Sequence, residues 1–382
     1  MNVFDVIIVG AGPSGAIAGF HLARAGLDVL LLEKCTFPRR KVCGGGLTQR
    51  ARKEIPFDIT PVIHDNVNWG YVGFRGRKIG RIYSDDTVAT LIERGTFDAF
   101  LLQKTINEGA VCLQDQRVIR IKETKGEIKV QTQDEEFHSR YLVGADGVNS
   151  LTARQLGLMR TRKTSLVYEA RLSLPDHVIP PLIQSITFDF GTVLSGYGWI
   201  FPKRDHLNVG VFRSWPGHKT SKQQLMRFIN QHPVLRDLSL IDIRAQPGPQ
   251  GGDKEILHKG RALLTGDSAN LADPWLGEGL YYALASGRMA AESILAHTAG
   301  LGEDLSDYTR SVNDTLVSQF AYAKKLAILV NLFPLINVHM LAASPILQNM
   351  VMDLLRGKRS YQQIWCDLKR RFPKIIHDIL KR

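Results

Sequence analysis

The residues best suited to bind a cofactor lie near the start of the chain. The apolar run Val6–Val9 is followed by Gly10, Gly12 and Gly15, and Glu33 closes the next apolar run. Gly10 permits a sharp turn, Gly12 a close approach of the backbone to a pyrophosphate, and Gly15 tight packing of a helix on a strand. A carboxylate about twenty residues further on would accept a ribose hydroxyl. The spacing therefore predicts dinucleotide binding, with a purely structural glycine turn as the alternative.

Two later turns repeat the combination of glycine and carboxylate. One apolar run leads into Asp146-Gly147 and another into Gly266-Asp267. Between the first and second turns, a polar loop ends in Cys43 and three consecutive glycines. Because glycines cannot fill a core, they free this backbone to approach a bound group closely or to adopt positive φ. A nicotinamide dehydrogenase needs only the first turn, so it remains open which dinucleotide is bound.

Composition sets the broad class of protein. The chain has 382 residues, of which 44% are hydrophobic and 23% charged, as in ordinary folded proteins. This length favours two closely packed domains. The four cysteines show neither a CxxC pair nor a zinc-ligand spacing, so we expect no metal site. Together with the lack of a secretory leader pattern, they predict a cytoplasmic protein.

The elements that would hold these residues follow from hydrophobic periodicity. Residues 1–34 have the pattern strand, helix, strand, which opens a parallel sheet with crossover helices. Apolar and polar residues alternate in residues 62–93 and 164–214, which predicts antiparallel sheet there. The sheet with the glycine turns is therefore expected to consist of three separated pieces of chain, with antiparallel segments inserted between them.

The region after residue 300 has a helical pattern with two unusual parts. Residues 326–352 carry no Lys, Arg, Asp or Glu and are long enough to span a bilayer, but Pro334 and Pro345 interrupt them. We therefore expect helices that line an apolar pocket or lie on a membrane surface. Residues 353–382 combine nine basic and three acidic residues with apolar residues at helical spacing, broken at Pro373.

The basic tail, residues 353–382, suits an anionic membrane surface at the inner face of the membrane. A solvated basic face is the simpler interpretation, and its apolar side would then pack on the core. Nucleic acid is not expected as a partner, because the aromatic residues of the tail have helical core spacing and are not interleaved as stacking platforms.

The three turns, separated by antiparallel sheet, resemble the FAD-containing reductases and monooxygenases of the p-hydroxybenzoate hydroxylase superfamily. Within it, residues 41–46 (Lys-Val-Cys-Gly-Gly-Gly) look like the Lys-x-Cys-Gly-Gly-Gly loop of the geranylgeranyl reductase family. Residues 197–202 (Tyr-Gly-Trp-Ile-Phe-Pro) resemble its Tyr-x-Trp-x-Phe-Pro motif, and residues 277–283 (Gly-Glu-Gly-Leu-Tyr-Tyr-Ala) its Gly-Glu-Gly-Ile-Tyr-Tyr-Ala segment. The resemblance covers about residues 3 to 300.

The resemblance implies FAD as the cofactor. The glycines of the opening turn, Gly10, Gly12 and Gly15, would approach its pyrophosphate. Further contacts would come from Ser14, Glu33, Cys43, Gly44, Gly46, Arg94, Val118, Asp267, Gly279 and Leu280. A helix that starts after the Pro-x-x-Gly-x-Gly turn would place its amino terminus at the flavin, where it stabilises the negative charge of the reduced ring.

Several of these residues have a simpler alternative role. Cys43 is the candidate proton donor, but it is also suited to be a small buried apolar residue. Arg94 either contacts FAD or only pairs with a neighbouring acid. Tyr197, Trp199 and Phe201 lie on one side of a strand, where they line either a substrate cavity or the core.

The expected fold class is α/β (α+β overall). A Rossmann-like FAD-binding domain would comprise residues 1–60, 95–160 and 255–300. An inserted antiparallel-sheet substrate domain would comprise the other segments up to residue 300, which are residues 61–94 and 161–254. A helical C-terminal region, residues 301–382, would complete the molecule.

The resemblance implies a reductase that saturates C=C bonds of a polyprenyl, geranylgeranyl-type chain by hydride transfer from reduced FAD. An apolar tunnel between the antiparallel sheet and the tail would hold a prenylated lipid, a quinone or a prenyl diphosphate. The electron donor remains open among NADPH, ferredoxin and a deazaflavin. The alternatives are an FAD-dependent monooxygenase or halogenase acting on a hydrophobic or aromatic substrate, and a membrane-peripheral binding protein with structural FAD.

Overall fold

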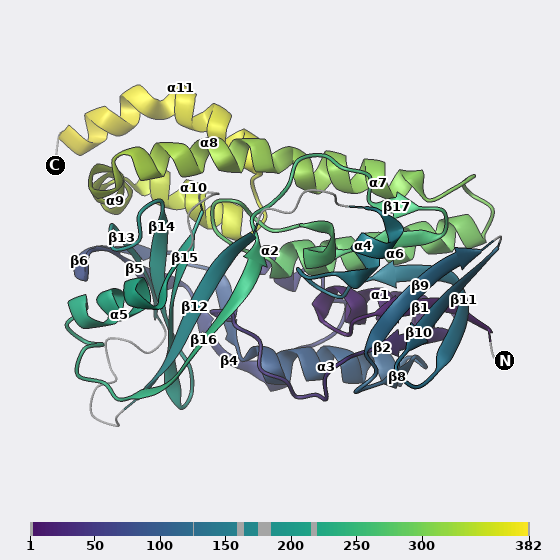
Figure 1. Ribbon diagram of the computed structural model, residues 1–382. Coiled ribbons are helices and arrows are strands. Elements are labelled where there is room, and N and C mark those ends of the chain that lie inside the picture. The colour runs from purple at the N-terminus through teal and green to yellow at the C-terminus, as the bar shows by residue number, and fades with distance from the viewer. Residues whose placement is uncertain (1–2, 125, 159–163, 175–184, 215–219, 381–382) are drawn as a thin grey trace.

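Two β-sheet units lie side by side, and helices from the later part of the chain lie across both (Figure 1). The computed structural model of the chain describes residues 3–124, 126–158, 164–174, 185–214 and 220–380. Lys381 and Arg382, which belong to the basic tail, lie outside the described residues. The mixture of a parallel sheet, largely antiparallel sheets and helices confirms the predicted α/β fold class.

The first sheet has eight strands, and five of them run parallel in the order β18-β11-β1-β2-β8. These five are β1 (Val3–Val9), β2 (Val29–Leu32), β8 (Val111–Leu113), β11 (Glu136–Gly144) and β18 (Ala262–Leu264). The other three are β9 (Val118–Thr124), β10 (Glu127–Thr132) and β17 (His258–Lys259).

Both faces of the parallel strands are covered, which explains their continuous apolar runs. Ile8 belongs to an apolar cluster with residues of α1 (Pro13–Arg24) and α6 (Leu280–Thr298). Ile7, which points to the opposite face, packs with residues of β9 and β10. The three pieces of chain expected in this sheet are therefore all present in it.

The second sheet has seven strands in the order β16-β12-β15-β14-β13-β5-β6. They are β5 (Trp69–Phe74), β6 (Arg77–Tyr83), β12 (Thr164–Ser173), β13 (Ser185–Phe190), β14 (Gly196–Pro202), β15 (His206–Arg213) and β16 (Leu240–Pro249). Helix α5 (Lys222–Gln231) packs on one face of this sheet through an apolar cluster that includes Phe228.

One strand pair of the second sheet differs from the predicted antiparallel arrangement. β5 and β13 run parallel, whereas every other neighbouring pair of this sheet is antiparallel. The two strands come from separate inserted segments, so no short turn joins them and imposes the antiparallel direction.

A third sheet of three strands connects the two units. Its strands are β3 (Gly46–Thr48), β4 (Ile63–Val67) and β7 (Ala89–Ile92), in the order β3-β7-β4. β3 begins at the last glycine of the glycine-rich loop and leads into α2 (Gln49–Arg52), and β7 leads into α3 (Arg94–Asn107). Three further short helices are α4 (Leu151–Leu156) and the 3₁₀ turns Thr60–Val62 and Gly266–Ala269.

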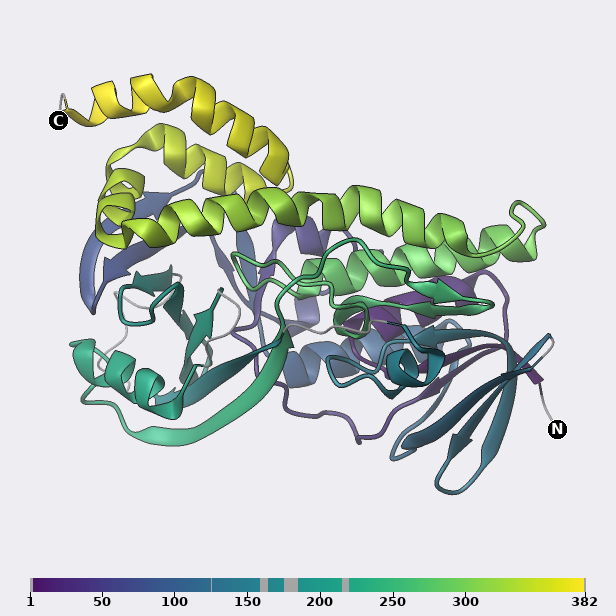
Figure 2. The ribbon, with the colours of Figure 1, turned by 45° about the horizontal axis from the view of Figure 1, so that its top comes forward.

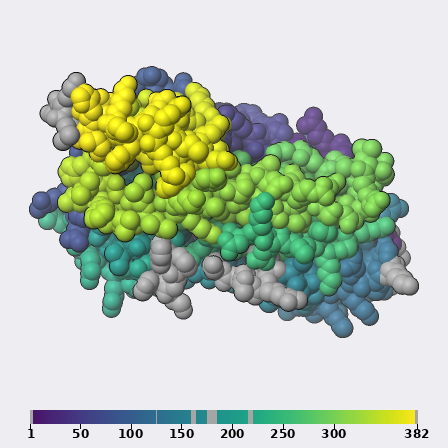
Figure 3. All heavy atoms as spheres, turned by 90° about the horizontal axis from the view of Figure 1, so that it is seen from above, coloured from purple at the N-terminus to yellow at the C-terminus, as the bar shows by residue number. Residues whose placement is uncertain are grey.

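The helical layer above the sheets is formed by the chain after α6 (Figure 2). Its helices are α7 (Ser306–Val312), α8 (Ser318–Leu332), α9 (Pro334–Ala343), α10 (Pro345–Leu355) and α11 (Tyr361–Leu380), with a π-helical segment, Asn313–Val317, between α7 and α8. Seen from above, these helices make up most of the visible surface (Figure 3). As predicted, Pro334 and Pro345 divide the charge-free run, and each occupies the first turn of a new helix.

The predicted break at Pro373 is wrong, because α11 continues through this residue. A proline removes one backbone hydrogen bond from a helix. Buried side chains on both sides of it, Ile364 and Ile375, hold the two halves of the helix against the molecule. The apolar side of α11 thus packs on α8 and α10 in its first half, as the simpler interpretation of the tail proposed.

No single helix of the described residues is long and apolar enough to cross a bilayer. The stretch Ser306–Leu332 and helix α9 pass the length and composition test only as a pair, and they meet at an angle of 104°.

Candidate functional site

The opening glycine turn has the geometry of a phosphate cradle. Gly10 adopts φ of 100°, and a Cβ atom there would lie 2.5 Å from the carbonyl oxygen of Ala145. A Cβ atom on Gly15 would overlap the carbonyl oxygen of Gly10. Gly12 is the N-cap of α1. Among the described residues, no side chain caps the backbone amides at the start of this helix. These amides can therefore face a phosphate directly, as a dinucleotide requires.

Glu33 is buried at the end of β2, next to this turn. Its carboxylate accepts hydrogen bonds from the amide of Ala11 at 2.9 Å and from the amide of Cys35 at 3.1 Å. Arg39 lies 4.0 Å away. Each carboxylate oxygen can accept two hydrogen bonds, so Glu33 keeps acceptor capacity for a ribose hydroxyl.

A second helix N-terminus without a side-chain cap among the described residues lies at the start of α6. Gly279 is the N-cap of this helix, and Leu280 is its first residue. A Cβ atom on Gly279 would lie 3.6 Å from the carboxylate of Asp267. Lys41, 3.8 Å from Asp267, brings the glycine-rich loop to the same place. Burial lowers the pKa of Lys41, and Asp267 partly offsets this effect.

The glycine-rich loop packs directly on the aromatic strand β14. A Cβ atom on Gly44 would lie 2.9 Å from the ring of Phe201, and one on Gly46 would lie 3.0 Å from it. Trp199 is 3.1 Å from the same position at Gly44. Only glycine lets this backbone come so close to the two rings, so the two motifs form one structure.

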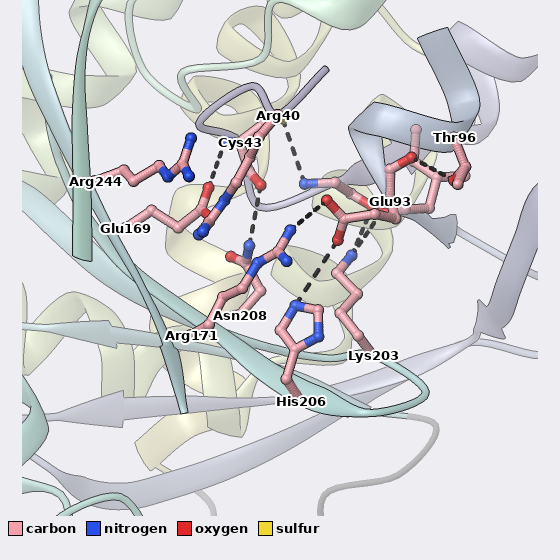
Figure 4. A network of polar contacts seen from close by, with 12 residues as sticks. Arg40, Cys43, Glu93, Thr96, Glu169, Arg171, Lys203, His206, Asn208 and Arg244 are labelled. Carbon is pink, nitrogen blue, oxygen red and sulfur yellow. Dashed lines mark hydrogen bonds and ion pairs between the residues drawn. The ribbon is translucent and has the colours of Figure 1, made fainter. Parts of the chain in front are cut away.

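Three polar side chains of the second sheet and its turn hold the backbone of this loop (Figure 4). Glu169 of β12 accepts the amide of Cys43 at 2.7 Å, and Asn208 of β15 donates to the carbonyl oxygen of Cys43 at 3.2 Å. Lys203, after β14, donates to the carbonyl oxygens of Gly45 at 3.3 Å and of the last residue of β7 at 2.8 Å. We call Glu169, Asn208 and Lys203 the loop clamp.

All three residues of the loop clamp are buried, and two of them are charged. Glu169 is 1% exposed and also accepts a hydrogen bond from Arg40 at 2.9 Å. Burial lowers the pKa of Lys203 to about 8. Asn208 also accepts a hydrogen bond from the indole of Trp199 at 2.7 Å, which links the clamp to the aromatic strand.

Arg94 pairs with a neighbouring acid, which is one of the two roles that the sequence left open. Its guanidinium forms a double hydrogen bond with Asp98, at 2.8 Å for each nitrogen, and also contacts Cys43. Burial disfavours the charged form of Arg94, but Asp98 and Cys43 outweigh this effect and raise its pKa. Arg94 is therefore a fixed cation next to the thiol, and its contact with FAD stays a prediction.

A buried network joins the region after the glycine-rich loop to the turn before α6. Arg50 of α2 is paired with Glu278 and lies 3.2 Å from Asp273, and the hydroxyl of Tyr361 donates to Asp273. Asp273 also accepts the amides of two residues of the turn, at 2.8 and 2.9 Å. Tyr361 belongs to α11, so a helix of the tail contacts the turn that leads to Gly279.

Most of the predicted cofactor-binding residues form two neighbouring groups. Gly10, Gly12, Ser14, Gly15 and Glu33 form the first, at the carboxyl end of β1 and β2. The second consists of Cys43, Gly44, Gly46, Arg94, Asp267, Gly279 and Leu280. The two groups meet where Ser14 approaches Gly266, with 3.0 Å between its hydroxyl and a Cβ atom built there.

The predicted cofactor contact Val118 and the three predicted substrate-binding aromatic residues do not belong to these two groups. Val118 begins β9 and packs with Val9 and Leu32, which places it beside the first group. Tyr197 shares an apolar cluster with Trp199 and Phe201, and its hydroxyl donates to the carbonyl oxygen of Leu276 in the turn before α6.

The predicted tunnel between the second sheet and the tail remains a prediction. A cavity of about 240 Å³ lies between α10 and α11, and a smaller one of about 90 Å³ lies where β5, the β13–β14 turn and α9 meet. Neither is lined by the glycine-rich loop. No group of three or more His, Cys, Asp or Glu in the described residues is arranged to hold a metal ion.

Sequence reasoning missed the loop clamp and the network around Asp273. Lys203 has a local signal, because it directly follows the proline of the Tyr-x-Trp-x-Phe-Pro motif. Glu169 and Asn208 alternate with apolar residues in their strands and have no such signal. Arg50 and Tyr361 are recognised only once the fold brings them to Asp273.

Comparison with known proteins identifies the class of protein that this geometry represents. A family model described as an FAD-binding domain matches residues 3–52 and 87–177. A crystal structure of a geranylgeranyl bacteriochlorophyll reductase-like protein from Thermoplasma acidophilum has the same fold, with a TM-score of 0.79. The two chains are 23% identical, and the alignment covers 100% of this chain and 99% of the other. The fold is thus a Rossmann-like FAD-binding fold, and the opening glycine turn and the N-terminus of α6 fit this cofactor.

Two relatives narrow the class to a family. An uncharacterised protein of Methanosarcina barkeri is 32% identical over 294 residues, which cover 77% of this chain and 75% of the relative. Digeranylgeranylglycerophospholipid reductase 1 of Methanopyrus kandleri is 29% identical over 311 residues, covering 76% of this chain and 80% of the relative. The chain belongs to the geranylgeranyl reductase family of FAD-dependent oxidoreductases.

Proposed function

We propose that the chain saturates C=C bonds in the polyprenyl chain of a lipid, a quinone or a prenyl diphosphate. The observation that carries the proposal is the packing of the glycine-rich loop on the aromatic strand, with Gly44 against Phe201 and Trp199. This contact supports a single site to which both the predicted flavin-binding loop and the predicted substrate-binding strand contribute. The family and its prenyl-reducing relatives support the same conclusion.

In this proposal, the first sheet and its helices form the FAD-binding domain, residues 1–60, 95–160 and 255–300. Gly10, Gly12 and Gly15 hold the pyrophosphate, and Glu33 holds the adenosine ribose. The remaining predicted contacts, Ser14, Cys43, Gly44, Gly46, Arg94, Val118, Asp267, Gly279 and Leu280, hold the rest of the cofactor. Residues 61–94 and 161–254 form the substrate domain.

Reduced FAD, when bound, supplies a hydride to one alkene carbon. The second carbon needs a proton, and Cys43 is the group that the site offers. Its Sγ accepts the amide of Gly45 at 3.3 Å, which leaves the thiol hydrogen free to point elsewhere. As the π bond breaks, two C–H bonds form, and solvent returns the proton to the sulfur. Arg94, beside Cys43, stabilises the thiolate left behind.

An isolated alkene has no carbonyl that the protein can polarise, so orientation and exclusion of water carry most of the catalysis. Tyr197, Trp199 and Phe201 would bind the chain through apolar contact, which contributes about 0.8 kcal/mol for each buried CH₂ group. The electron donor stays open among NADPH, ferredoxin and a deazaflavin. We propose that the enzyme works in the cytoplasm, at the inner face of the membrane, where such lipids lie.

The test uses purified protein reconstituted with FAD and reduced chemically under anaerobic conditions. It is incubated separately with a geranylgeranyl diphosphate, a menaquinone and a digeranylgeranyl phospholipid. We expect mass spectrometry to detect products heavier by about two hydrogens per reduced bond for one of these classes. Cys43→Ser should lower the rate but keep bound FAD, whereas Gly15→Ala should abolish FAD binding.

Three results would overturn the proposal. A protein that retains no FAD would refute the cofactor assignment. Oxygen consumption with a hydroxylated or halogenated product would favour a monooxygenase or halogenase. Flavin absorbance that does not change when a reductant is added would favour a binding protein with structural FAD.

A further inference from the structure

A group of exposed apolar side chains marks the junction of α8 and α9. Leu332 and Phe333 are each 62% exposed, and Ile336 is 57% exposed. Three neighbours are also exposed, though less so, at 39–44%: Ile328, Leu329 and Leu335. We call residues 328–336 the apolar corner. Large contiguous apolar patches are rare on monomers and mark interaction sites.

The apolar corner lies next to the hairpin formed by β5 and β6. Helix α9 packs so closely on β6 that a Cβ atom on Gly80 would overlap the side chain of Ala342. The hollow of about 90 Å³ is lined by Phe74 at the hairpin tip and by Pro334 of α9. Leu194, in the β13–β14 turn, lines the same hollow and is 70% exposed. Three separate segments thus meet at this end of the molecule (Figure 1).

The hairpin supplies positive charge beside the apolar corner. Residues 69–83 contain Arg75, Arg77, Lys78 and Arg81, all exposed, and no acidic residue. Residues 326–352 contain no Asp, Glu, Lys or Arg. We call residues 74–81 the basic hairpin.

Two of the basic side chains lie against aromatic rings. Lys78 lies 3.8 Å from the centre of the Tyr71 ring, and Arg81 lies 4.7 Å from the centre of the Trp69 ring. Asp86 follows the end of β6, away from the tip of the hairpin. It pairs with Arg356 at 3.4 Å and not with a basic residue of the hairpin. Tyrosine and tryptophan are the aromatic residues that favour a membrane–water interface.

We propose that the apolar corner and the basic hairpin together form a docking surface for an anionic lipid bilayer. The corner enters the boundary between headgroups and acyl chains, and the hairpin contacts the anionic headgroups. A second copy of the chain is a poor occupant, because a twofold contact would bring the two basic hairpins together. The basic tail, by contrast, uses most of its apolar side for packing inside the molecule.

The docking surface also connects to the aromatic strand. Phe190 packs in a cluster with Val338 of α9, and its ring lies 6.2 Å from that of Tyr197. Phe188 continues the row, with ring centres 5.3 Å from Tyr197 and 5.6 Å from Phe201. A prenyl chain that leaves the bilayer at the corner would follow these rings to the glycine-rich loop. This route rests on the proposed function, whereas the docking does not.

The test is sedimentation of the full-length FAD-loaded protein with vesicles of phosphatidylglycerol or of phosphatidylcholine. We expect binding to phosphatidylglycerol vesicles that weakens as salt is added. The double variant Leu332→Asp/Phe333→Asp should bind at least tenfold more weakly. The matched control is Leu301→Asp, which changes a leucine that is 77% exposed between α6 and α7, at the other end of the molecule. It should bind like the wild type.

A second pair of variants tests the charge. Arg77→Gln/Lys78→Gln should weaken binding by about fivefold for each residue. All substituted side chains are exposed, so flavin content and thermal unfolding should match the wild type. An assay of the reduction of a detergent-dispersed prenyl substrate, without vesicles, separates the two proposals. A protein that binds vesicles but does not reduce this substrate would refute the proposed function and leave the docking surface supported.

Three results would overturn the docking surface. The first is a wild type that does not sediment with phosphatidylglycerol vesicles. The second is a Leu332→Asp/Phe333→Asp variant that binds these vesicles as well as the wild type does. The third is a dimer in light scattering that this variant converts to a monomer, while neither protein binds vesicles. In that case a second copy covers the apolar corner.

Discussion

Lys203 shows how a single buried cation can hold a cofactor loop. It is 5% exposed and donates to backbone carbonyl oxygens of Gly45 and Ile92, so it joins the glycine-rich loop to β7. A charge in this position is costly, which is why its pKa falls to about 8. The two carbonyl groups would otherwise be buried without a donor.

The lowered pKa of Lys203 makes the stability depend on pH. Its ordinary pKa is 10.5, so between about pH 8 and 10.5 the unfolded chain binds this proton and the folded chain does not. The contribution of Lys203 to the free energy of unfolding therefore rises with pH across this window, by at most about 1.4 kcal/mol per pH unit. In Lys203→Met this rise should disappear from urea unfolding curves measured between pH 7 and 11. Lys254→Met, at an exposed site, should keep it; an unchanged slope in Lys203→Met would contradict the assignment.

Glu169 should matter for both stability and cofactor retention. Glu169→Gln removes the charge that faces Arg40 and weakens the acceptor for the Cys43 amide, so we expect a loss of about 1–3 kcal/mol. The loop would become less ordered, and FAD would dissociate more readily during gel filtration. Glu135→Gln, at an exposed position, serves as the control. Wild-type stability and flavin content in Glu169→Gln would show that the clamp is unimportant.

The opening turn and the loop clamp differ in how visible they are in the sequence. Gly10, Gly15 and Glu33 have a short, fixed spacing, and local backbone sterics alone dictate their types. The residues of the clamp lie far along the chain from the backbone groups that they hold. Glu169 is 126 residues from Cys43, and Lys203 is 158 residues from Gly45. Such pairs depend on how two sheets are placed, which no local pattern specifies.

At the scale of elements, the glycine-rich loop and β14 depend on each other. Gly44 has no Cβ atom because Phe201 and Trp199 occupy that space. The aromatic strand therefore acts as a template for the loop, and the loop covers one face of the aromatic cluster. This explains why the two motifs occur together.

Gly44→Ala tests this dependence. The added methyl would lie 2.9 Å from the Phe201 ring, so the ring or the loop must shift, at a cost of about 1–3 kcal/mol. We expect a lower melting temperature and a changed flavin absorbance spectrum. Gly302→Ala adds a methyl with ordinary contacts, 3.6 Å from the nearest atom, and should change neither. Equal melting temperatures and spectra for both variants would refute the close packing.

The sequence predicted the elements better than their pairing. The parallel strands, the prolines that begin α9 and α10 and the inserted sheet strands all follow from local patterns. The parallel pairing of β5 with β13 does not, because it joins two inserted segments whose relative direction is set by the whole sheet. The continuation of α11 through Pro373 similarly depends on packing against the molecule.

At the scale of the whole molecule, one hydroxyl group of the tail supports the turn that leads to Gly279. Tyr361 of α11 is 1% exposed and donates to Asp273, which in turn holds the turn before α6. Arg50 reaches the same carboxylate from α2. Three regions far apart in sequence thus share one buried acid.

Tyr361→Phe removes this link while keeping the ring. Asp273 loses one of its donors, and we expect a loss of about 1–3 kcal/mol of stability. Hydrogen exchange measured by mass spectrometry should become faster in residues 274–279. Tyr83→Phe, which alters an exposed tyrosine, provides the comparison. If exchange in the turn stays the same, the tail does not support the site.

The position of Tyr361 has a consequence for how the protein is made. The ribosome releases the chain in order, so Glu33 emerges long before Asp267, and Tyr361 later still. The first sheet cannot gain β18, nor can the turn before α6 gain its last partner, until these residues have left the exit tunnel. A nascent chain would therefore expose an incomplete flavin site until Tyr361 has emerged, and FAD is expected to bind only after that point.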